Sequence, residues 1–322
     1  MVVPNSAGGP VHLPVMRDRI VALLAPALQQ PGSVYLDCTV GLGGHARAVL
    51  EACPQARLIA IDRDPAALDL AAENLADFAG RVELYQAIYH ELDEVLAEAG
   101  VPSVQAICMD LGLSSLQIDS THRGFAYATD APLDMRMDPG QTVTAATIVN
   151  GLDAVALARL LRTLGDERFA DRIARRIVAA REARPIENSA ELVRIIVDAI
   201  PMAARNSGGH PAKRSFQALR IAVNDELTSL ADALPTALDA LSLGGRLAVL
   251  AYHSGEDRLV KRAFAQAAAD HVPPGVPVVP DALKARFHVL TRGAERPEES
   301  ETTTNPRAAS ARLRAIARNQ EV

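Results

Sequence analysis

The chain has 322 residues, 49% of them hydrophobic and 22% charged, and its formal net charge is −6. This length exceeds a typical single domain, so we expect either one large domain with an insertion or two domains. The acidic balance argues against a uniformly basic nucleic-acid-binding protein.

Apolar runs and cysteines in the sequence indicate the cellular location of the protein and the state of its thiols. No apolar run reaches the ~18 residues that a membrane span needs, and no secretory signal is visible after Met1. Cys38, Cys53 and Cys108 are odd in number and lack metal-ligand spacing. We therefore expect a cytoplasmic protein with reduced thiols, no metal site and no membrane partner.

The first third of the chain alternates strand-like and helix-like segments. Helices are expected at 65–78 and 92–99, and strands near residues 33–37, 57–62, 81–85 and 104–109. This alternation predicts a parallel sheet with helices on both faces. Ligand-binding residues should gather where the strands end, which is where Gly41–His45, Asp62, Tyr89 and Asp110 fall.

A glycine-rich turn, Gly41-Leu42-Gly43-Gly44-His45, follows the first strand. With Asp62 about 20 residues on, it fits the degenerate dinucleotide-binding pattern, so an NAD-dependent dehydrogenase is one interpretation. A turn that merely joins strand to helix is another. Asp37 favours S-adenosylmethionine, because a carboxylate before the turn suits the cationic amino acid end of that cofactor and disfavours a pyrophosphate.

The segment from Asp110 to Asp119 leaves the fourth strand at the same edge of the sheet. Asp110 and nearby carbonyl groups are hydrogen-bond acceptors. They suit methyl transfer to an amine, because acceptors that bind the amine hydrogens localise its lone pair and aim it at the methyl group. The alternative is a strand-terminating loop that Asp110 and Ser114 cap.

The pattern changes after Asp110. Residues 119–138 are polar and loop-like, and from 144 to 200 the apolar spacing becomes helical, with a helix start at Asn188 or Ser189. A long helix is expected over 215–230 and a strand over 246–252. We therefore expect a core of residues 1–114 and 213–322, interrupted by a helical insertion at 115–212 that recognises the substrate.

The C-terminal part is less regular. We expect a Pro-rich loop at 273–280, a strand at 287–291, a mobile acidic linker at 295–304 and a final strand at 311–317. Positive charge is concentrated elsewhere. Eight arginines lie between Arg159 and Arg184, and charge alone favours solvated helix faces over phosphate binding there.

Taken together, these segments resemble a known family across nearly the whole length of the chain. It is the bacterial ribosomal small-subunit methyltransferase H (MraW-type) family, whose members methylate a cytidine of 16S rRNA at N4. The blocks that carry the resemblance are His12–Met16, Asp37–His45, Ile61–Pro65, Asp110–Asp119, Arg123–Phe125, Pro132–Asp138, Gly165–Ala170, His210–Ile221, Tyr252–Arg258 and Asn305–Arg307. Departures from the family pattern are Leu116, Gly255 and Ala309, which lie outside the glycine turn.

The resemblance implies an α/β fold, a class I (Rossmann-like) methyltransferase with a mostly parallel sheet and a helical insertion. It also implies S-adenosylmethionine as cofactor and 16S rRNA within the small ribosomal subunit as partner. The implied cofactor-binding residues are Gly41, Gly43, Gly44, His45, Asp62, Tyr89, Asp110 and Gln117, to which the sequence pattern itself adds Asp37. Tyr89 would face the adenine and Asp62 the ribose.

In the light of this resemblance, Asp110 is the expected catalytic residue and accepts hydrogens of the cytosine amine during direct in-line methyl transfer. Candidate substrate contacts are Phe125, Tyr127, Lys213, Arg214 and His253, with core packing as the alternative for Phe125 and loop ordering as the alternative for His253. An assembly factor that binds the cofactor without catalysis is a further alternative. The sequence leaves the oligomeric state open, with a homodimer as one option.

Overall fold

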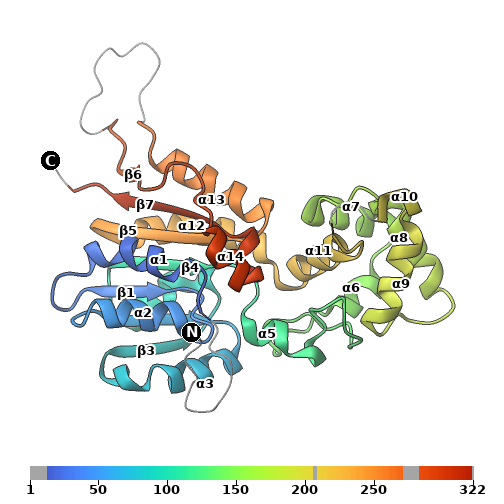
Figure 1. Cartoon of the computed structure of the whole chain (residues 1–322), viewed down its shortest axis with the longest axis horizontal. Coiled ribbons are helices and arrows are strands. Elements are labelled where there is room, and N and C mark those ends of the chain that lie inside the picture. Colours follow the sequence, from blue (N-terminus) through green and yellow to red (C-terminus); the bar gives the residue numbers. More distant parts are fainter. Residues whose placement is uncertain (1–12, 206–208, 271–282, 321–322) are drawn as a thin grey trace, which may run out of the picture. The chain divides into compact units, whose positions relative to one another are not determined.

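The computed structural model describes residues 13–205, 209–270 and 283–320 (Figure 1). It divides into two compact units, which we call the core unit (Met1–Gly112 and Thr228–Val322) and the helical unit (Leu113–Leu227). The expected return to the core at residue 213 is wrong, because the helix that begins at Lys213 packs within the helical unit. The Pro-rich loop expected at 273–280 lies outside the described residues.

Within the described residues, the core unit is built on one seven-stranded sheet in the order β3-β2-β1-β4-β5-β7-β6. β1 to β5 run parallel, whereas β7 is antiparallel to both β5 and β6. The predicted mostly parallel sheet is therefore confirmed. The strands are β1 (Val34–Asp37), β2 (Arg57–Asp62), β3 (Val82–Gln86), β4 (Val104–Asp110), β5 (Leu241–Ala251), β6 (Phe287–Val289) and β7 (Arg312–Arg318).

Helices cover both faces of this sheet (Figure 1). They are α1 (Arg17–Leu24), α2 (Gly44–Ala52), α3 (Pro65–Asn74), α4 (Leu92–Glu98), α12 (Glu226–Ala240), α13 (Ser254–Ala267) and α14 (Glu299–Thr304). Short 3₁₀ turns are η1 (Ala25–Ala27), η2 (Ala76–Arg81), η3 (Tyr89–Glu91) and η6 (Pro306–Ser310). None of the described helices is long and apolar enough to cross a bilayer.

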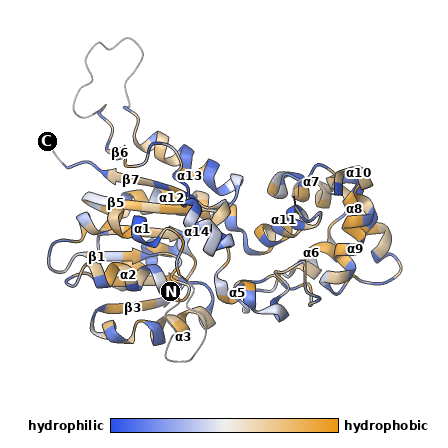
Figure 2. Ribbon diagram, viewed as in Figure 1, coloured by the Kyte–Doolittle hydropathy of each residue, from blue (hydrophilic) through white to orange (hydrophobic). Residues whose placement is uncertain are grey.

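Two hydrophobic clusters hold the layers together, one on each face of the sheet. Because side chains alternate along a strand, Leu36 of β1 packs with α4, α12 and α13, whereas Tyr35 packs with α1, α2 and α3. Figure 2 shows hydrophobic residues along the strands. All three cysteines are buried and unpaired with one another, as the sequence predicts.

The helical unit has its own core. Its helices are α5 (Ser115–Asp119), α6 (Ala145–Gly151), α7 (Ala154–Gly165), α8 (Ala170–Arg181), α9 (Ser189–Ala199), α10 (Met202–Arg205) and α11 (Lys213–Asn224), with the 3₁₀ turn η4 (Thr121–Arg123). The apolar positions that predict these helices, such as Leu157, Ile173 and Leu192, are fully buried together. Asn188 caps α9 as predicted, and its side chain accepts a hydrogen bond from the Glu191 amide.

Two predicted segments differ from the structure. The helix expected at 215–230 is divided into α11 and α12, because Asp225 adopts a left-handed conformation (φ 48°) that ends α11. The linker expected at 295–304 is partly ordered: Glu295 forms two hydrogen bonds with Arg19, and α14 occupies Glu299–Thr304.

Candidate functional site

The predicted glycine turn joins β1 to α2 at the carboxyl edge of the sheet. Gly41 and Gly43 have positive φ angles of 53° and 79°, and Gly43 precedes the first turn of α2. Gly44 is restricted by packing, because a Cβ there would lie 2.5 Å from Cγ of Pro14. The turn therefore needs glycine at each of these positions, and its backbone N–H groups stay close to the strand tips.

Two carboxylates organise this turn from neighbouring strands. Asp37, at the end of β1, is 2% exposed and accepts hydrogen bonds from the Tyr35 hydroxyl (2.9 Å) and the Thr39 amide (3.1 Å). Asp62, at the end of β2, accepts from the amides of Gly41 (2.8 Å) and Asp64 (3.0 Å). Burial raises the pKa of each carboxyl to about 6, and these hydrogen bonds only partly oppose that effect.

Asp110 lies at the end of β4 and is held from three sides. Its amide donates to the Thr39 hydroxyl (2.7 Å), and its Oδ1 accepts from the Tyr252 hydroxyl (2.7 Å). Nδ1 of His45, a residue only 7% exposed, lies 3.6 Å from Oδ2, while His45 Nε2 is 2.9 Å from the Val15 carbonyl oxygen. Burial raises the pKa of Asp110, and both His45 and the Tyr252 hydroxyl act to lower it.

The three carboxylates influence one another. The charge of Asp110 contributes to the raised pKa of Asp37, and the charge of Asp37 contributes to that of Asp62. Like charges at this spacing are repulsive unless a cation lies between or beside them. The carboxyl edge of β1, β2 and β4 therefore favours a positively charged ligand.

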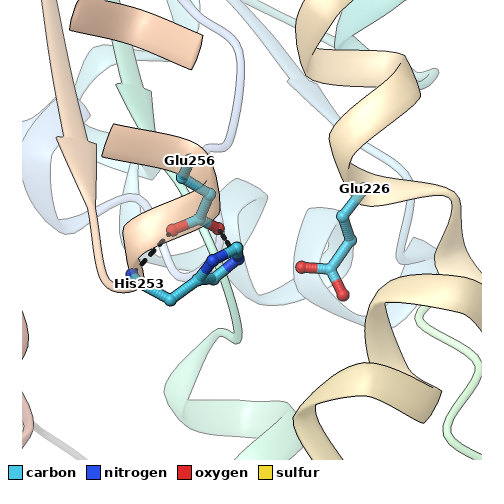
Figure 3. A group of neighbouring side chains, drawn as sticks. All are labelled: Glu226, His253 and Glu256. Carbon is cyan, nitrogen blue, oxygen red and sulfur yellow. Dashed lines mark hydrogen bonds and ion pairs between the residues drawn. The ribbon is translucent and has the colours of Figure 1, made fainter. Parts of the chain in front are cut away.

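The loop after β5 contributes Tyr252 and His253 to the core unit. Glu256, 2% exposed, accepts hydrogen bonds from the amides of Tyr252 and His253, at 2.8 and 3.2 Å. Figure 3 shows the bond from the His253 amide and the contact between the other Glu256 carboxylate oxygen and His253 Nε2, which are 3.2 Å apart. His253 Nδ1 accepts from the Gly255 amide, so His253 caps α13 and orders this loop. Glu226, also drawn in Figure 3, belongs to the helical unit, where it binds Arg220 through hydrogen bonds of 2.8 and 2.9 Å.

Tyr89, the residue expected beside the adenine, begins η3 at the same edge of the sheet. It is half-buried and packs against the hydrophobic cluster that contains Leu36 and Ile61. Its place beside the adenine stays a prediction.

The remaining predicted site residues lie in the helical unit. Gln117 is 3% exposed and forms a capping box with Ser114, in which each backbone amide donates to the side chain of the other residue, at 3.1 and 3.2 Å. Phe125 is half-buried against the unit's core, with the Arg123 guanidinium 5.9 Å from its ring centroid. Lys213 and Arg214 are exposed in the first turn of α11.

Tyr127 also lies in the helical unit. Its ring stacks on that of His210 with centroids 4.6 Å apart, and it meets Phe216 edge-on at 6.1 Å. Part of the Tyr127 side chain stays exposed.

Sequence reasoning missed three residues that position the predicted ones. Tyr252 directly follows a strand at the ligand edge, so the rule that identified Asp110 applies to it as well. Thr39 and Glu256 act through hydrogen bonds to Asp110 and to the Tyr252 loop. No spacing pattern in the sequence predicts these two contacts. The Thr39 hydroxyl binds the amide of Asp110, which is distant in sequence, and Glu256 binds a backbone amide, which every residue except proline has.

Comparison with known proteins adds to this geometry. The model of the MraW methylase family matches residues 10–319. A protein of Frankia alni is 56% identical over 96% of this chain and 95% of its own length, and one of Streptomyces avermitilis is 54% identical over 96% and 98%. A protein of Cutibacterium acnes is 55% identical over 96% and 92%. All three are named ribosomal RNA small subunit methyltransferase H.

Proposed function

The chain belongs to the MraW methylase family and is a methyltransferase, and we propose that it methylates N4 of a cytidine in 16S rRNA of the small ribosomal subunit with S-adenosylmethionine as donor. The observation that carries the proposal is the set of three carboxylates, Asp37, Asp62 and Asp110, at the carboxyl edge of β1, β2 and β4 around the glycine turn.

The charge and the hydrogen-bonding capacity of these carboxylates fit S-adenosylmethionine. S-adenosylmethionine carries a positive sulfur and a cationic amino group, which an acidic pocket attracts. Each oxygen of Asp62 already accepts one amide hydrogen and keeps a second lone pair for a ribose hydroxyl. A dinucleotide would bring a pyrophosphate to the same edge, and its charge would be repelled by the carboxylates. The acidic edge therefore disfavours the NAD interpretation.

In the proposed site, the backbone of Gly41, Gly43 and Gly44 lines the cofactor, and Asp37 attracts its cationic end. Asp62 holds the ribose, and Tyr89 covers the adenine. His45 adds a buried imidazole beside Asp110. Gln117, in the helical unit, stays a prediction.

When bound, S-adenosylmethionine supplies a methyl group that is already activated by its positive sulfur. The chain is therefore required to bind and orient the amine, with no covalent enzyme intermediate. Asp110 accepts hydrogens of the cytosine amine, which localises the amine lone pair. The Tyr252 hydroxyl occupies one lone pair of Oδ1, and His45 Nδ1 lies 3.6 Å from Oδ2, so each oxygen of Asp110 keeps a lone pair that can accept an amine hydrogen.

The test combines labelled S-adenosylmethionine with 30S subunits from a strain that lacks the enzyme, followed by mapping of the labelled nucleotide. We expect label on one cytidine at N4. Asp110→Ala should abolish turnover, whereas Asp69→Ala, which removes an exposed carboxylate of the same unit, should leave it unchanged. Substantial methylation by Asp110→Ala would reject the role of Asp110. Cofactor binding without any methyl transfer by the wild type would support an assembly factor instead.

A further inference from the structure

The two helices α7 and α8 present a strongly basic surface on a protein of net charge −6. Their apolar faces, including Leu161 and Ile177, are buried in the core of the helical unit. The exposed basic residues on these two helices and their connecting turn are Arg159, Arg162, Arg168, Arg172, Arg175 and Arg176.

Most of this positive charge is not neutralised by the protein. Arg162 forms an ion pair with Asp171 at 2.5 Å, and this hydrogen bond is the main reason why the pKa of Asp171 is lowered. Asp171 also attracts Arg175, but no ion pair is found for Arg168, Arg172 or Arg175 in the part of the chain that the structure describes. An excess of like charge on one face is repulsive, and an external polyanion would relieve it.

The N-terminus of α11 adds two more cations to the same place. Gly165, the last residue of α7, packs so tightly on α11 that a Cβ there would lie 2.5 Å from the Arg214 carbonyl oxygen. The Arg214 guanidinium donates to the Asp166 carbonyl at 3.3 Å. Cations in the first turn of a helix are unfavourable to the helix dipole, so Lys213 and Arg214 are not explained by helix stability.

An aromatic pair adjoins these cations. His210 stacks on Tyr127 with an angle of 17° between the rings. His210 is tied to the first turn of α11, because its Nδ1 accepts from the Ala212 amide (3.2 Å) and its carbonyl accepts from the Lys213 amide (3.0 Å). The His210 side chain is exposed and offers a ring on which a base can stack.

We propose that this arginine surface, formed by Arg168, Arg172 and Arg175 with Lys213 and Arg214, binds the sugar–phosphate backbone of single-stranded RNA. Guanidinium groups suit bidentate contact with phosphate, and an aromatic ring next to cations is the usual platform for an unpaired base. The inference rests on the proposed function in choosing RNA as the polyanion. It assigns to α7, α8 and α11 the contacts that hold RNA beyond the methylated nucleotide.

The test measures binding of a fluorescein-labelled single-stranded oligoribonucleotide of 16S rRNA sequence by the full chain at several salt concentrations. The triple variant R168Q/R172Q/R175Q should bind at least about tenfold more weakly at 0.1 M salt. Its plot of log affinity against log salt should be less steep by about 2, roughly 0.7 for each phosphate contact. The control R258Q/K261Q/R262Q removes three exposed charges from α13 and should change neither quantity.

Unchanged affinity and slope in the arginine-surface variant would overturn the inference, as would equal losses in both variants. Stacking is tested separately with His210→Ala, which should weaken binding of the oligoribonucleotide but not of an abasic oligomer of equal length. Equal weakening of both oligomers would reject the stacking role.

The outcome is independent of the proposed reaction. If the wild type methylates 30S subunits and the triple variant keeps the same KM, the RNA-binding role of the arginine surface is wrong and the proposed function stands. If RNA binding depends on these arginines while no nucleotide is methylated, the proposed function fails and the surface stands.

Discussion

Individual carboxylates at the sheet edge are held in an unfavourable state that a cationic ligand would relieve. Asp37 is almost fully buried, yet it is surrounded by hydrogen-bond donors that suit its charged form. Its pKa of about 6 lies above the ordinary value of 3.8 because burial outweighs those hydrogen bonds. A residue in this state lowers stability at neutral pH, and a bound cation would offset that cost.

Affinity for S-adenosylmethionine should therefore fall as pH drops through about 6. Asp37 and Asp62 both lose their charge in that range, and with it their attraction for a cation. Isothermal titration calorimetry between pH 5 and 8 measures this, and we expect a decrease of about tenfold per pH unit below 6 for each carboxylate that binding requires. A Kd that is constant over this range would contradict the prediction.

Asp37→Asn should bind the cofactor more weakly and yet raise the free energy of unfolding at pH 7. The unfolded carboxyl ionises near 3.8 and the folded one near 6, so stability falls as pH rises from about 4 to 6 and stays low above 6. Removing this group removes the penalty, by up to about 3 kcal/mol at 1.36 kcal/mol per pKa unit. Urea unfolding at pH 4 and pH 7 measures the effect, which should vanish at the lower pH.

Tyr252 is a positioning residue, because its hydroxyl fixes and partly neutralises Asp110. Tyr252→Phe should lower kcat by roughly tenfold, the scale of one lost hydrogen bond to a charged group, with little change in cofactor Kd. The hydroxyl lowers the pKa of Asp110, so its loss should move the acidic limb of the kcat–pH profile to higher pH. A variant with reduced kcat but an unmoved profile would show that Tyr252 has only a packing role.

At the scale of elements, the local sequence pattern was sufficient to predict the bounds of most strands. The strands from β1 to β4 are found within one residue of their predicted bounds, because β1, β2 and β4 are short apolar runs between turns and β3 alternates apolar and polar residues. The division between α11 and α12 was missed, since Asp225 ends a helix through its backbone conformation and an aspartate carries no strong stop signal. The ordering of α14 depends on residues distant in sequence, among them Arg19.

The same distinction applies to the site. Asp37, Asp62 and Asp110 were predicted because the carboxyl ends of parallel strands share one edge. The hydroxyls of Thr39 and Tyr252 were not, because their hydrogen bonds to Asp110 join the ends of β1, β4 and β5. Sequence spacing within one segment contains no information about such contacts.

Asn224, at the end of α11, connects that helix to a loop far away in sequence. It is fully buried, and its side chain accepts from the Met137 amide (2.8 Å) and donates to the carbonyls of Met135 (2.8 Å) and Arg220 (2.9 Å). Asn224→Ala should destabilise the helical unit by about 3 kcal/mol, because buried backbone groups lose their partners. Thermal unfolding measures the loss, and Thr142→Ala, at an exposed position of the same unit, serves as a control. Equal stability of the two variants would contradict this.

At the scale of the whole molecule, the two units differ in how the chain forms them. The core unit is assembled from two separate segments of chain, so β5, β6 and β7 must find β4 after the helical unit has been synthesised. The helical unit is one continuous segment, in which α7, α8 and α9 pack on their neighbours in sequence and α11 returns to pack on α7. A continuous segment of helices with mostly local contacts folds quickly.

The helical unit should therefore fold when residues 113–227 are expressed alone. Its apolar side chains, such as Leu161, Ile173 and Phe216, are buried against one another, so its core is self-contained. We expect a helical circular dichroism spectrum and one cooperative thermal transition. The fragment should also bind the single-stranded oligoribonucleotide with the salt dependence of the full chain, since the arginine surface lies wholly within it. It should not bind S-adenosylmethionine, because Asp37, Asp62 and the glycine turn belong to the core unit. A fragment that folds but does not bind RNA would confirm that the core of the unit is self-contained and would contradict the RNA-binding role proposed for the arginine surface.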